Sequence, residues 1–274
     1  MNNTLLNKNE RIDDLHLNNL KLIQNPNQFC FGVDAVLLAH FASKGIKSGS
    51  RTMDMCAGNG IISILLSHKS AAEEIIGLEI QKDVSDMASR SVILNNLSKK
   101  INMVCGDLKF ASDIFGKSSF NNIVCNPPYK EYGGGLISKH NSAAIARHEI
   151  LCNAEDIIKS SSELLMPGGK LAMIHRPERL IDLVTLMRNY KIEPKRLRFV
   201  HPSYKKTATM ILLEGTYCGR PKLVLEPPLY IYEETGAKYT DEINLIYERT
   251  AELKDKSEGE SYEKIGRASC RERV

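Results

Sequence analysis

Asn126-Pro127-Pro128-Tyr129 is the segment of this chain best suited to chemistry. The side-chain oxygen of Asn126 can accept a hydrogen bond. The carbonyl of Pro127 is a second acceptor, and the rigid φ angles of two consecutive prolines fix its direction. Tyr129 adds an aromatic face on which a planar ring can stack. The segment therefore fits a planar amino group with two N–H bonds. The alternative is a Pro-Pro turn that closes a strand.

A second motif, Asp54-Met55-Cys56-Ala57-Gly58-Asn59-Gly60, follows a short apolar run. Its two glycines let the backbone approach a ligand and open a helix N-terminus toward it. Glu79 ends the next apolar run, where an acidic side chain can accept the hydroxyls of a ribose. Asp107 follows a third run, where it either accepts the amino protons of an adenine or forms a turn. This pattern predicts a nucleotide-like cofactor.

In this order, the two motifs resemble the S-adenosylmethionine-dependent amino-group methyltransferases. NAD is the competing cofactor, but its pattern needs a third glycine where Ser63 stands. Cys56 departs from the methyltransferase pattern Asp-x-Gly-x-Gly-x-Gly at its first glycine position. The resemblance implies S-adenosylmethionine as the cofactor. The residues expected to contact it are Phe31, Gly32, Asp54, Cys56, Ala57, Gly58, Asn59, Gly60, Glu79, Ile80, Asp107, Leu108 and Asn126.

The chemistry implied for Asn126, Pro127, Pro128 and Tyr129 is methylation of an amino group. The exocyclic nitrogen of adenine is a poor nucleophile because its lone pair is delocalised into the ring. Two acceptors on its N–H bonds pull the nitrogen toward tetrahedral geometry and free the lone pair to attack the sulfonium methyl. The reaction needs no metal and no covalent nucleophile. The same motif also serves glutamine amides in proteins and guanine N2 in ribosomal RNA, so it leaves the substrate open.

Further segments resemble the bacterial tRNA adenine-N6 methyltransferases, and the likeness runs from about Glu10 to about Tyr247. Members of that family modify the adenosine 3′ of the anticodon in a valine tRNA, so the resemblance implies tRNA as the partner. The segments that carry the likeness are Glu10–Leu15, Phe29–Leu38, Arg147–Glu149 and Arg176–Leu180.

Two of these segments acquire expected roles from the resemblance. Phe31-Gly32-Val33-Asp34 is expected to close over the cofactor, although it also fits the start of an apolar helix capped by Asp34. Arg147 and His148 are expected to face the substrate, and a solvated helix face is the alternative for them.

A basic cluster between Arg188 and Lys206 contains a single acid, Glu193, and includes Tyr204. Such a concentration of positive charge is the electrostatic footprint of phosphate binding, although charge runs also form solvated surfaces. The residues expected to contact the tRNA backbone are Lys195, Arg196, Arg198, Lys205 and Lys206. The acidic segment Asp241–Glu263 is expected to be a solvated helix that does not contact RNA.

Strands and helices must position these residues. From about Thr52 to His175, short apolar runs typical of strands alternate with helical patterns. Helices are expected from about Ile61, from about Lys82, before the stop signal Pro167-Gly168-Gly169, and over Leu180–Tyr190. The alternation predicts an α/β fold with a mostly parallel sheet. The resemblance implies that this is a Rossmann-like methyltransferase domain, with a seven-stranded sheet and a closing antiparallel hairpin. The expected strands are Thr52–Cys56, Glu74–Ile80, Ile101–Cys105, Asn122–Cys125, Lys170–His175, Arg196–His201 and Thr209–Glu214.

Composition and cysteine usage narrow the class of protein and its expected location. With 42% hydrophobic residues, the chain can bury a sizeable core. The sequence has no apolar run long enough for a membrane span or a secretory signal, and its scattered cysteines favour a reducing compartment. We therefore expect a cytoplasmic monomer without a metal site. The net charge of +4 decides nothing about partners.

Four regions are expected along the chain. Residues 1–48 close over the cofactor, 49–216 form the methyltransferase domain, and 217–263 are a C-terminal extension. Residues 264–274 resemble a translated sequencing-adapter read, and we expect them not to be native. Two other enzyme classes stay open but are disfavoured. A protein-glutamine N5 methyltransferase typically has an N-terminal helical domain, and a DNA adenine methyltransferase needs a target-recognition domain. A binding protein with a decayed site is disfavoured because Asp54, Glu79, Asp107 and Asn126 are all present.

Overall fold

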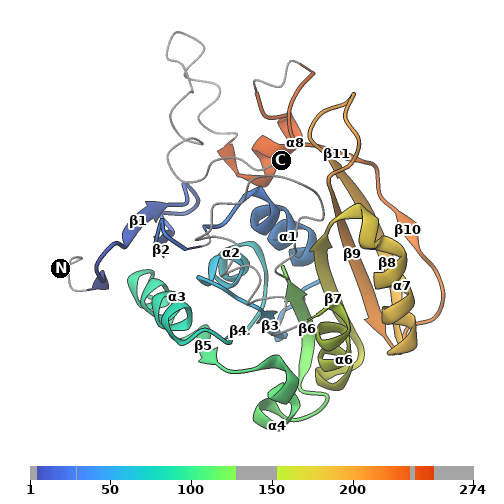
Figure 1. Ribbon diagram of the computed structural model, residues 1–274, viewed down its shortest axis with the longest axis horizontal. Helices are drawn as coiled ribbons and strands as arrows, with labels where there is room; N and C mark the ends of the chain where they lie inside the picture. The colour runs from blue at the N-terminus through green and yellow to red at the C-terminus, as the bar shows by residue number, and fades with distance from the viewer. Residues whose placement is uncertain (1–4, 29, 128–152, 235–237, 250–274) are drawn as a thin grey trace.

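A twisted sheet forms the centre of the computed structural model, which describes residues 5–28, 30–127, 153–234 and 238–249 (Figure 1). Its seven longer strands lie in the order β5-β4-β3-β6-β7-β9-β8. Six of them point in the same direction, and β9 is antiparallel to its neighbours β7 and β8, so the predicted fold class and closing hairpin are confirmed. These strands are β3 (Arg51–Met55), β4 (Glu74–Glu79), β5 (Ile101–Cys105), β6 (Phe120–Cys125), β7 (Leu165–His175), β8 (Ile192–His201) and β9 (Met210–Tyr217).

Two further strands make the sheet nine-stranded rather than seven-stranded. The added strands, β10 (Val224–Leu225) and β11 (Leu229–Tyr230), both pair in parallel with the outer side of β8. They satisfy backbone groups that an edge strand would otherwise expose. Strands of two residues have no alternating pattern that sequence reasoning can detect, which is why the prediction stopped at seven.

The β7 boundary also differs from the expectation. The strand begins at Leu165 rather than at Lys170, because Leu165 pairs with Phe120 at the start of β6. Pro167-Gly168-Gly169 therefore lies within the strand, where the register between β6 and β7 shifts, instead of only ending the preceding helix.

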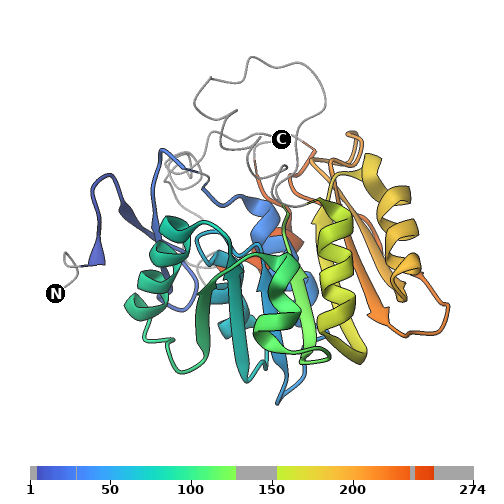
Figure 2. The same cartoon turned by 60° about the horizontal axis from the view of Figure 1, so that its bottom comes forward.

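Helices cover both faces of the sheet (Figures 1 and 2). One apolar core joins α1, α2 and α8 to one face, and a second joins α4, α6 and α7 to the other. Within β3, Met53 and Met55 belong to the second core, whereas Asp54 bonds to α2 on the opposite face. The described helices are α1 (Val33–Ser43), α2 (Ile61–Lys69), α3 (Lys82–Leu94), α4 (Ala111–Phe115), α6 (Ala154–Leu164), α7 (Leu180–Asn189) and α8 (Asp241–Ile246), with single 3-10 turns at Leu108–Phe110 and Pro177–Arg179.

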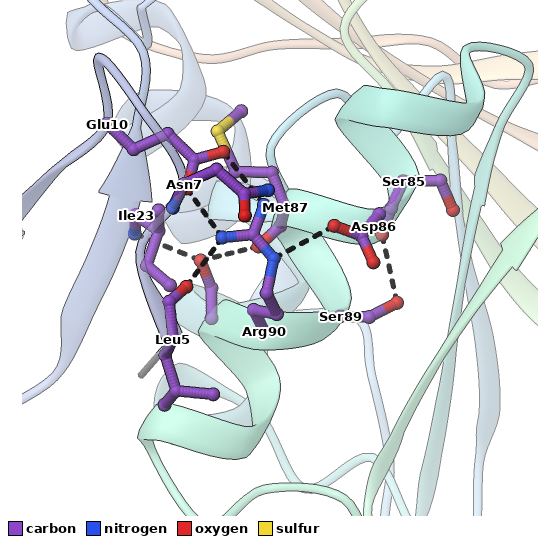
Figure 3. Close-up of polar contacts among 10 residues, drawn as sticks. Leu5, Asn7, Glu10, Ile23, Ser85, Asp86, Met87, Ser89 and Arg90 are labelled. Atoms are coloured by element: carbon purple, nitrogen blue, oxygen red, sulfur yellow. Dashed lines mark hydrogen bonds and ion pairs between the residues drawn. The ribbon is translucent and has the colours of Figure 1, made fainter. Parts of the chain in front are cut away.

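An N-terminal hairpin, which the sequence did not predict, stands beside α3 at the side of the molecule away from β8 (Figure 1). Its strands are β1 (Arg11–Asp14) and β2 (Lys21–Gln24). Arg90 of α3 holds the segment that leads into β1, since its guanidinium donates to both carboxylate oxygens of Glu10 at 2.5 and 2.8 Å (Figure 3). The same guanidinium donates to the Leu5 carbonyl and to Asp86. These contacts fasten the N-terminal segment to the domain.

The C-terminal part of the described chain packs onto the domain. Ile243 and Ile246 of α8 are buried in the core that contains α1. The expectation of a solvated helix over Asp241–Glu263 is therefore wrong for the described part. There the helix ends at Ile246, and one of its faces is buried. Residues 250–263 lie outside the described residues. Among the helices that the structure does describe, none is both long and apolar enough to span a bilayer.

Candidate active site

The predicted site residues converge at the carboxyl edge of the parallel strands. The glycine turn follows β3, Glu79 ends β4, Asp107 follows β5 and Asn126 follows β6. These four strands are neighbours in the sheet and run in the same direction, so their ends lie side by side. Open α/β sheets bind ligands at this edge. The strand order therefore assembles one site from four separate segments of the chain.

The turn between β3 and α2 alternates residues of left-handed backbone conformation. Cys56, Gly58 and Gly60 have φ angles of 62°, 55° and 82°. A Cβ atom on Gly58 would meet nothing within 4 Å, so the turn leaves open space there. A Cβ atom on Gly60 would instead lie 3.2 Å from the Cβ of Ala88 in α3. Gly58 thus borders open space, and Gly60 lets α2 and α3 approach each other.

Cys56 has a left-handed backbone conformation that favours glycine. Its departure from the glycine pattern is therefore expected to lower the stability of the fold. We expect Cys56→Gly to be more stable than Cys56→Ala by about 1 kcal/mol in free energy of unfolding, because both lose the thiol but only Ala keeps the left-handed strain. Urea denaturation of the two variants measures the difference. At Ala88, inside α3, the order should be reversed, with Ala88→Gly less stable than the parent. Equal stability of the two Cys56 variants would contradict the strain.

Asp54 lies fully buried beneath the turn. One carboxylate oxygen accepts hydrogen bonds from the backbone N–H and the hydroxyl of Ser63, at 2.9 and 2.8 Å. Burial raises the pKa of Asp54 to about 7, against the lowering effect of the Ser63 hydrogen bonds. Since its bonds go to the first turns of α2, Asp54 holds that helix and the glycine turn against β3.

Glu79 lies beside the glycine turn with 4% of its surface exposed. One carboxylate oxygen accepts from the Gly58 N–H at 2.9 Å, and the other accepts from the backbone N–H of Gln81 at 3.0 Å. These bonds fix the carboxylate at the rim of the turn. Asp107 accepts from the Lys109 N–H at 2.9 Å and begins a 3-10 turn, so the turn-forming alternative applies to it. Its neighbour Leu108 is buried.

The N-terminal hairpin reaches the glycine turn through Gln24, a residue that the sequence did not single out. Its side-chain oxygen accepts from the Asn59 amide at 3.1 Å and from the Phe31 N–H at 3.2 Å. Its side-chain nitrogen donates to Asp13 of β1. Gln24 is 1% exposed, so this chain of bonds is buried and ties the Phe31 segment to the turn. A lone glutamine in a four-residue strand carries no sequence signal for such a role.

Asn126 presents the most informative polar atom of the site. Its side-chain N–H donates to the carboxylate of Asp34 in α1 at 2.9 Å. Its side-chain oxygen is shielded from solvent, and the described residues offer it no hydrogen-bond partner. A buried acceptor without a partner is costly and needs an explanation, of which a missing ligand is one. Pro127 is described and buried, whereas the predicted residues Pro128, Tyr129, Arg147 and His148 lie outside the described residues.

Arg196 and Arg198 of β8 do not form an exposed basic surface. Arg196 bonds Glu214 at 3.0 Å and Glu226 at 2.6 Å, and its guanidinium stacks over Phe41. Arg198 is 7% exposed and bonds Glu242 at 2.8 Å. These pairs join β8 to β9, α1 and the C-terminal segment. The positions of these two arginines do not support the prediction that they contact phosphate, because their charges are already paired within the fold.

The lysines of the same cluster differ in their hydrogen bonds, ion pairs and exposure to solvent. Lys195 donates to the Arg220 carbonyl, and Lys205 forms an ion pair with Glu234. Lys205 and Lys206 are exposed on the turn after β8, beside Tyr204, which is itself 71% exposed. Because β8 runs in the same direction as β7 and β6, this turn lies at the same edge of the sheet as Asn126.

Comparison with known proteins now places this geometry in a family. The family model described as "Methyltransferase small domain" matches residues 19–190. The chain belongs to the methyltransferase small domain family. Enzymes of this family are S-adenosylmethionine-dependent, so the predicted enzyme class and cofactor are confirmed. The matched region runs from β2 to the end of α7 and includes the glycine turn and Asn126.

One relative and two solved structures show how much of the chain is similar to known proteins. A protein of Porphyromonas gingivalis named tRNA1(Val) (adenine(37)-N6)-methyltransferase is 30% identical over 188 residues, which are 67% of this chain and 72% of the relative. A predicted O-methyltransferase of Agrobacterium tumefaciens has a TM-score of 0.62 at 20% identity, over 78% of this chain and 95% of that one. M. jannaschii TYW2 in complex with AdoMet has a TM-score of 0.53 at 12% identity, over 77% and 87%. The two structures support the fold.

Proposed function

We propose that the protein methylates the exocyclic N6 of an adenine in tRNA, the adenosine 3′ of the anticodon of a valine tRNA. The observation that carries the proposal is the buried, unpartnered side-chain oxygen of Asn126 at the carboxyl edge of the sheet, next to the glycine turn. The name of the Porphyromonas gingivalis relative supports the choice of substrate. A tRNA substrate implies that the enzyme acts in the cytoplasm.

The described residues fit S-adenosylmethionine. Gly58 leaves open space at the turn, and the buried carboxylate of Glu79 lies beside it with capacity for further hydrogen bonds, since each oxygen can accept more than one. Glu79 would bind the ribose hydroxyls, and the turn between Cys56 and Gly60 would face the rest of the cofactor. When bound, S-adenosylmethionine supplies a methyl group on a positively charged sulfur that is already a good leaving group.

The protein's contribution to the reaction is to hold the amino group. The Asn126 side-chain oxygen accepts one N–H bond of adenine N6, and the Pro127 carbonyl accepts the other. These contacts strengthen as the nitrogen becomes tetrahedral and its N–H bonds become more acidic, so they favour the transition state over the bound substrate. Acceptors that are fixed before the substrate arrives need no reorganisation during the reaction.

Mass spectrometry of nucleosides tests the proposal directly. Purified enzyme, S-adenosylmethionine and tRNA from cells that lack the modification should yield N6-methyladenosine, and digestion into oligonucleotides should locate it next to the valine anticodon. Methylation of another tRNA would overturn only the position. Absence of N6-methyladenosine with enzyme that binds the cofactor would overturn the RNA substrate, and labelled methyl groups in protein glutamine would identify the alternative reaction.

Among the described residues, Lys205 and Lys206 are the exposed candidates for phosphate contact at the site edge, and the partner of Lys205, Glu234, is itself exposed. We expect their joint replacement by Ala to flatten the dependence of log affinity for tRNA on log salt by up to about two units, because each phosphate contact releases roughly one counterion. The KM for tRNA should rise with little change in the chemical step. Binding titrations across a salt series measure the slope.

The matched control replaces Lys47 and Lys99 with Ala. Both lysines are exposed, but they precede β3 and β5 and so lie at the opposite edge of the sheet. This control carries the same change in net charge. If it flattened the slope as much as the Lys205 and Lys206 replacement, the effect would report overall charge, and the proposed contact would be wrong.

A further inference from the structure

The Asn126 side chain has a hydrogen bond that determines which way its amide faces. Asp34 and Asn126 are 92 residues apart in the sequence, and their side chains meet at 2.9 Å between the start of α1 and the end of β6. A carboxylate oxygen only accepts hydrogen bonds, so the amide must turn its N–H group toward Asp34. The amide oxygen then faces the other way, where it is shielded from solvent and without a partner among the described residues.

The two orientations of an amide have nearly the same shape but opposite chemistry. With the oxygen toward the substrate, Asn126 accepts an N–H bond of the amino group. With the amide reversed, two N–H groups would oppose each other in a site shielded from water, where an unmatched donor is costly. We infer that Asp34 is a positioning residue that fixes the Asn126 oxygen toward the reacting amino group. This inference rests on the proposed function, in which Asn126 holds that group.

Local structure makes Asp34 suitable for this task. It lies in the first turn of α1, where the positive end of the helix dipole favours a carboxylate. The helix is anchored by its apolar residues from Ala35 to Ala39, all of them buried, so Asp34 is held on a rigid element. A Cβ atom at Gly32 would lie 2.8 Å from an Asp34 carboxylate oxygen, so the preceding glycine gives the carboxylate its room.

The competing role for Asp34 is only to stabilise the start of α1. That role predicts a loss of stability when the carboxylate is removed, and the loss should not depend on the residue at position 126. If Asp34 orients the amide, the effect of Asp34 should depend on whether the side chain of residue 126 ends in one oxygen and one nitrogen, as an amide does, or in two oxygens. A carboxylate at position 126 presents an oxygen in either orientation, so it does not need Asp34.

Four proteins therefore test the inference: the parent, Asp34→Asn, Asn126→Asp and the double variant. Asp34→Asn keeps the size of the side chain but adds a donor that can lock the Asn126 amide in the wrong orientation. We expect it to lower the turnover of tRNA methylation by about tenfold, with the KM for tRNA and the Kd for S-adenosylmethionine within about twofold of the parent. In the Asn126→Asp background, the same change should raise turnover, because it relieves the repulsion of two facing carboxylates.

The reversal of sign is the decisive result. Equal fractional losses from Asp34→Asn in both backgrounds would overturn the inference in favour of a helix-start role, as would parental turnover in Asp34→Asn. Loss of folding or of cofactor binding in Asp34→Asn would also overturn it, since the residue would then support the fold. A parent enzyme that binds S-adenosylmethionine but methylates no RNA would instead overturn the proposed function.

Discussion

Asn126→Ala is expected to lower turnover by about a hundredfold or more while cofactor affinity stays near that of the parent. The amide oxygen is a buried acceptor that the described residues leave unpartnered, so its removal takes away the proposed contact with the amino group. Loss of one preorganised hydrogen bond that strengthens in the transition state has an effect of this size in other enzymes. Single-turnover methylation of tRNA at saturating cofactor measures the chemical step.

Asn121→Ala provides the control for this variant. Asn121 belongs to the same strand, β6, but its side-chain oxygen accepts from the Arg51 N–H at the opposite end of that strand. The control removes a hydrogen-bonded asparagine of the same strand without touching the site, so turnover should stay near the parental value. A folded Asn126→Ala protein with turnover close to that of the parent would show that the segment after β6 only closes a strand.

The parts of the site that sequence reasoning located share one property: each follows directly from a strand and its turn. The glycine turn, Glu79 and Asn126 all stand immediately at or after a parallel strand, and parallel strands bring their carboxyl ends together. Local patterns therefore suffice to place them. The contacts that orient them are different, because Asp34 and Asn126 are 92 residues apart and Gln24 and Asn59 are 35 apart. No local pattern encodes such pairings.

The basic cluster shows how a count of charges along the chain misleads. Arg196 and Arg198 are two residues apart in β8, so both side chains point to the same face of the sheet. That face is covered by α1 and the C-terminal segment, which provide Phe41 and Glu242. Of the five residues predicted to contact the tRNA backbone, only Lys205 and Lys206, on the turn after β8, are exposed. Strand periodicity, applied to the charged residues as well as the apolar ones, separates the two groups.

The parts of the fold that the sequence did not predict are short strands. The hairpin of β1 and β2 has strands of four residues, and its position depends on distant contacts such as that between Glu10 and Arg90 (Figure 3). The two-residue strands β10 and β11 form only because β8 offers a free edge. Elements of this length have too few residues to show periodicity, and tertiary contacts decide whether they form.

Glu79→Ala is expected to weaken binding of S-adenosylmethionine by roughly 1.5–3 kcal/mol, the usual contribution of hydrogen bonds to a charged group. This corresponds to about a tenfold to 150-fold rise in Kd. Glu74→Ala is the matched control, since Glu74 begins the same strand and pairs with Arg51 at the opposite edge of the sheet. Calorimetric titration of both variants with S-adenosylmethionine measures the change. Unchanged affinity in Glu79→Ala, or tight binding of NAD by the parent, would contradict the cofactor assignment.

A weaker affinity in Glu79→Ala could arise in two ways, because Glu79 also accepts from the Gly58 N–H and so supports the turn. Two ligands separate these causes: S-adenosylhomocysteine and its 2′-deoxyribose analogue. If Glu79 binds the ribose hydroxyls, the variant should lose less affinity for the deoxy analogue, because one of the contacts is already missing. If the variant only loosens the turn, both ligands should lose affinity equally. The difference between the two losses therefore measures the ribose contact itself, free of the contribution that Glu79 makes to the shape of the turn.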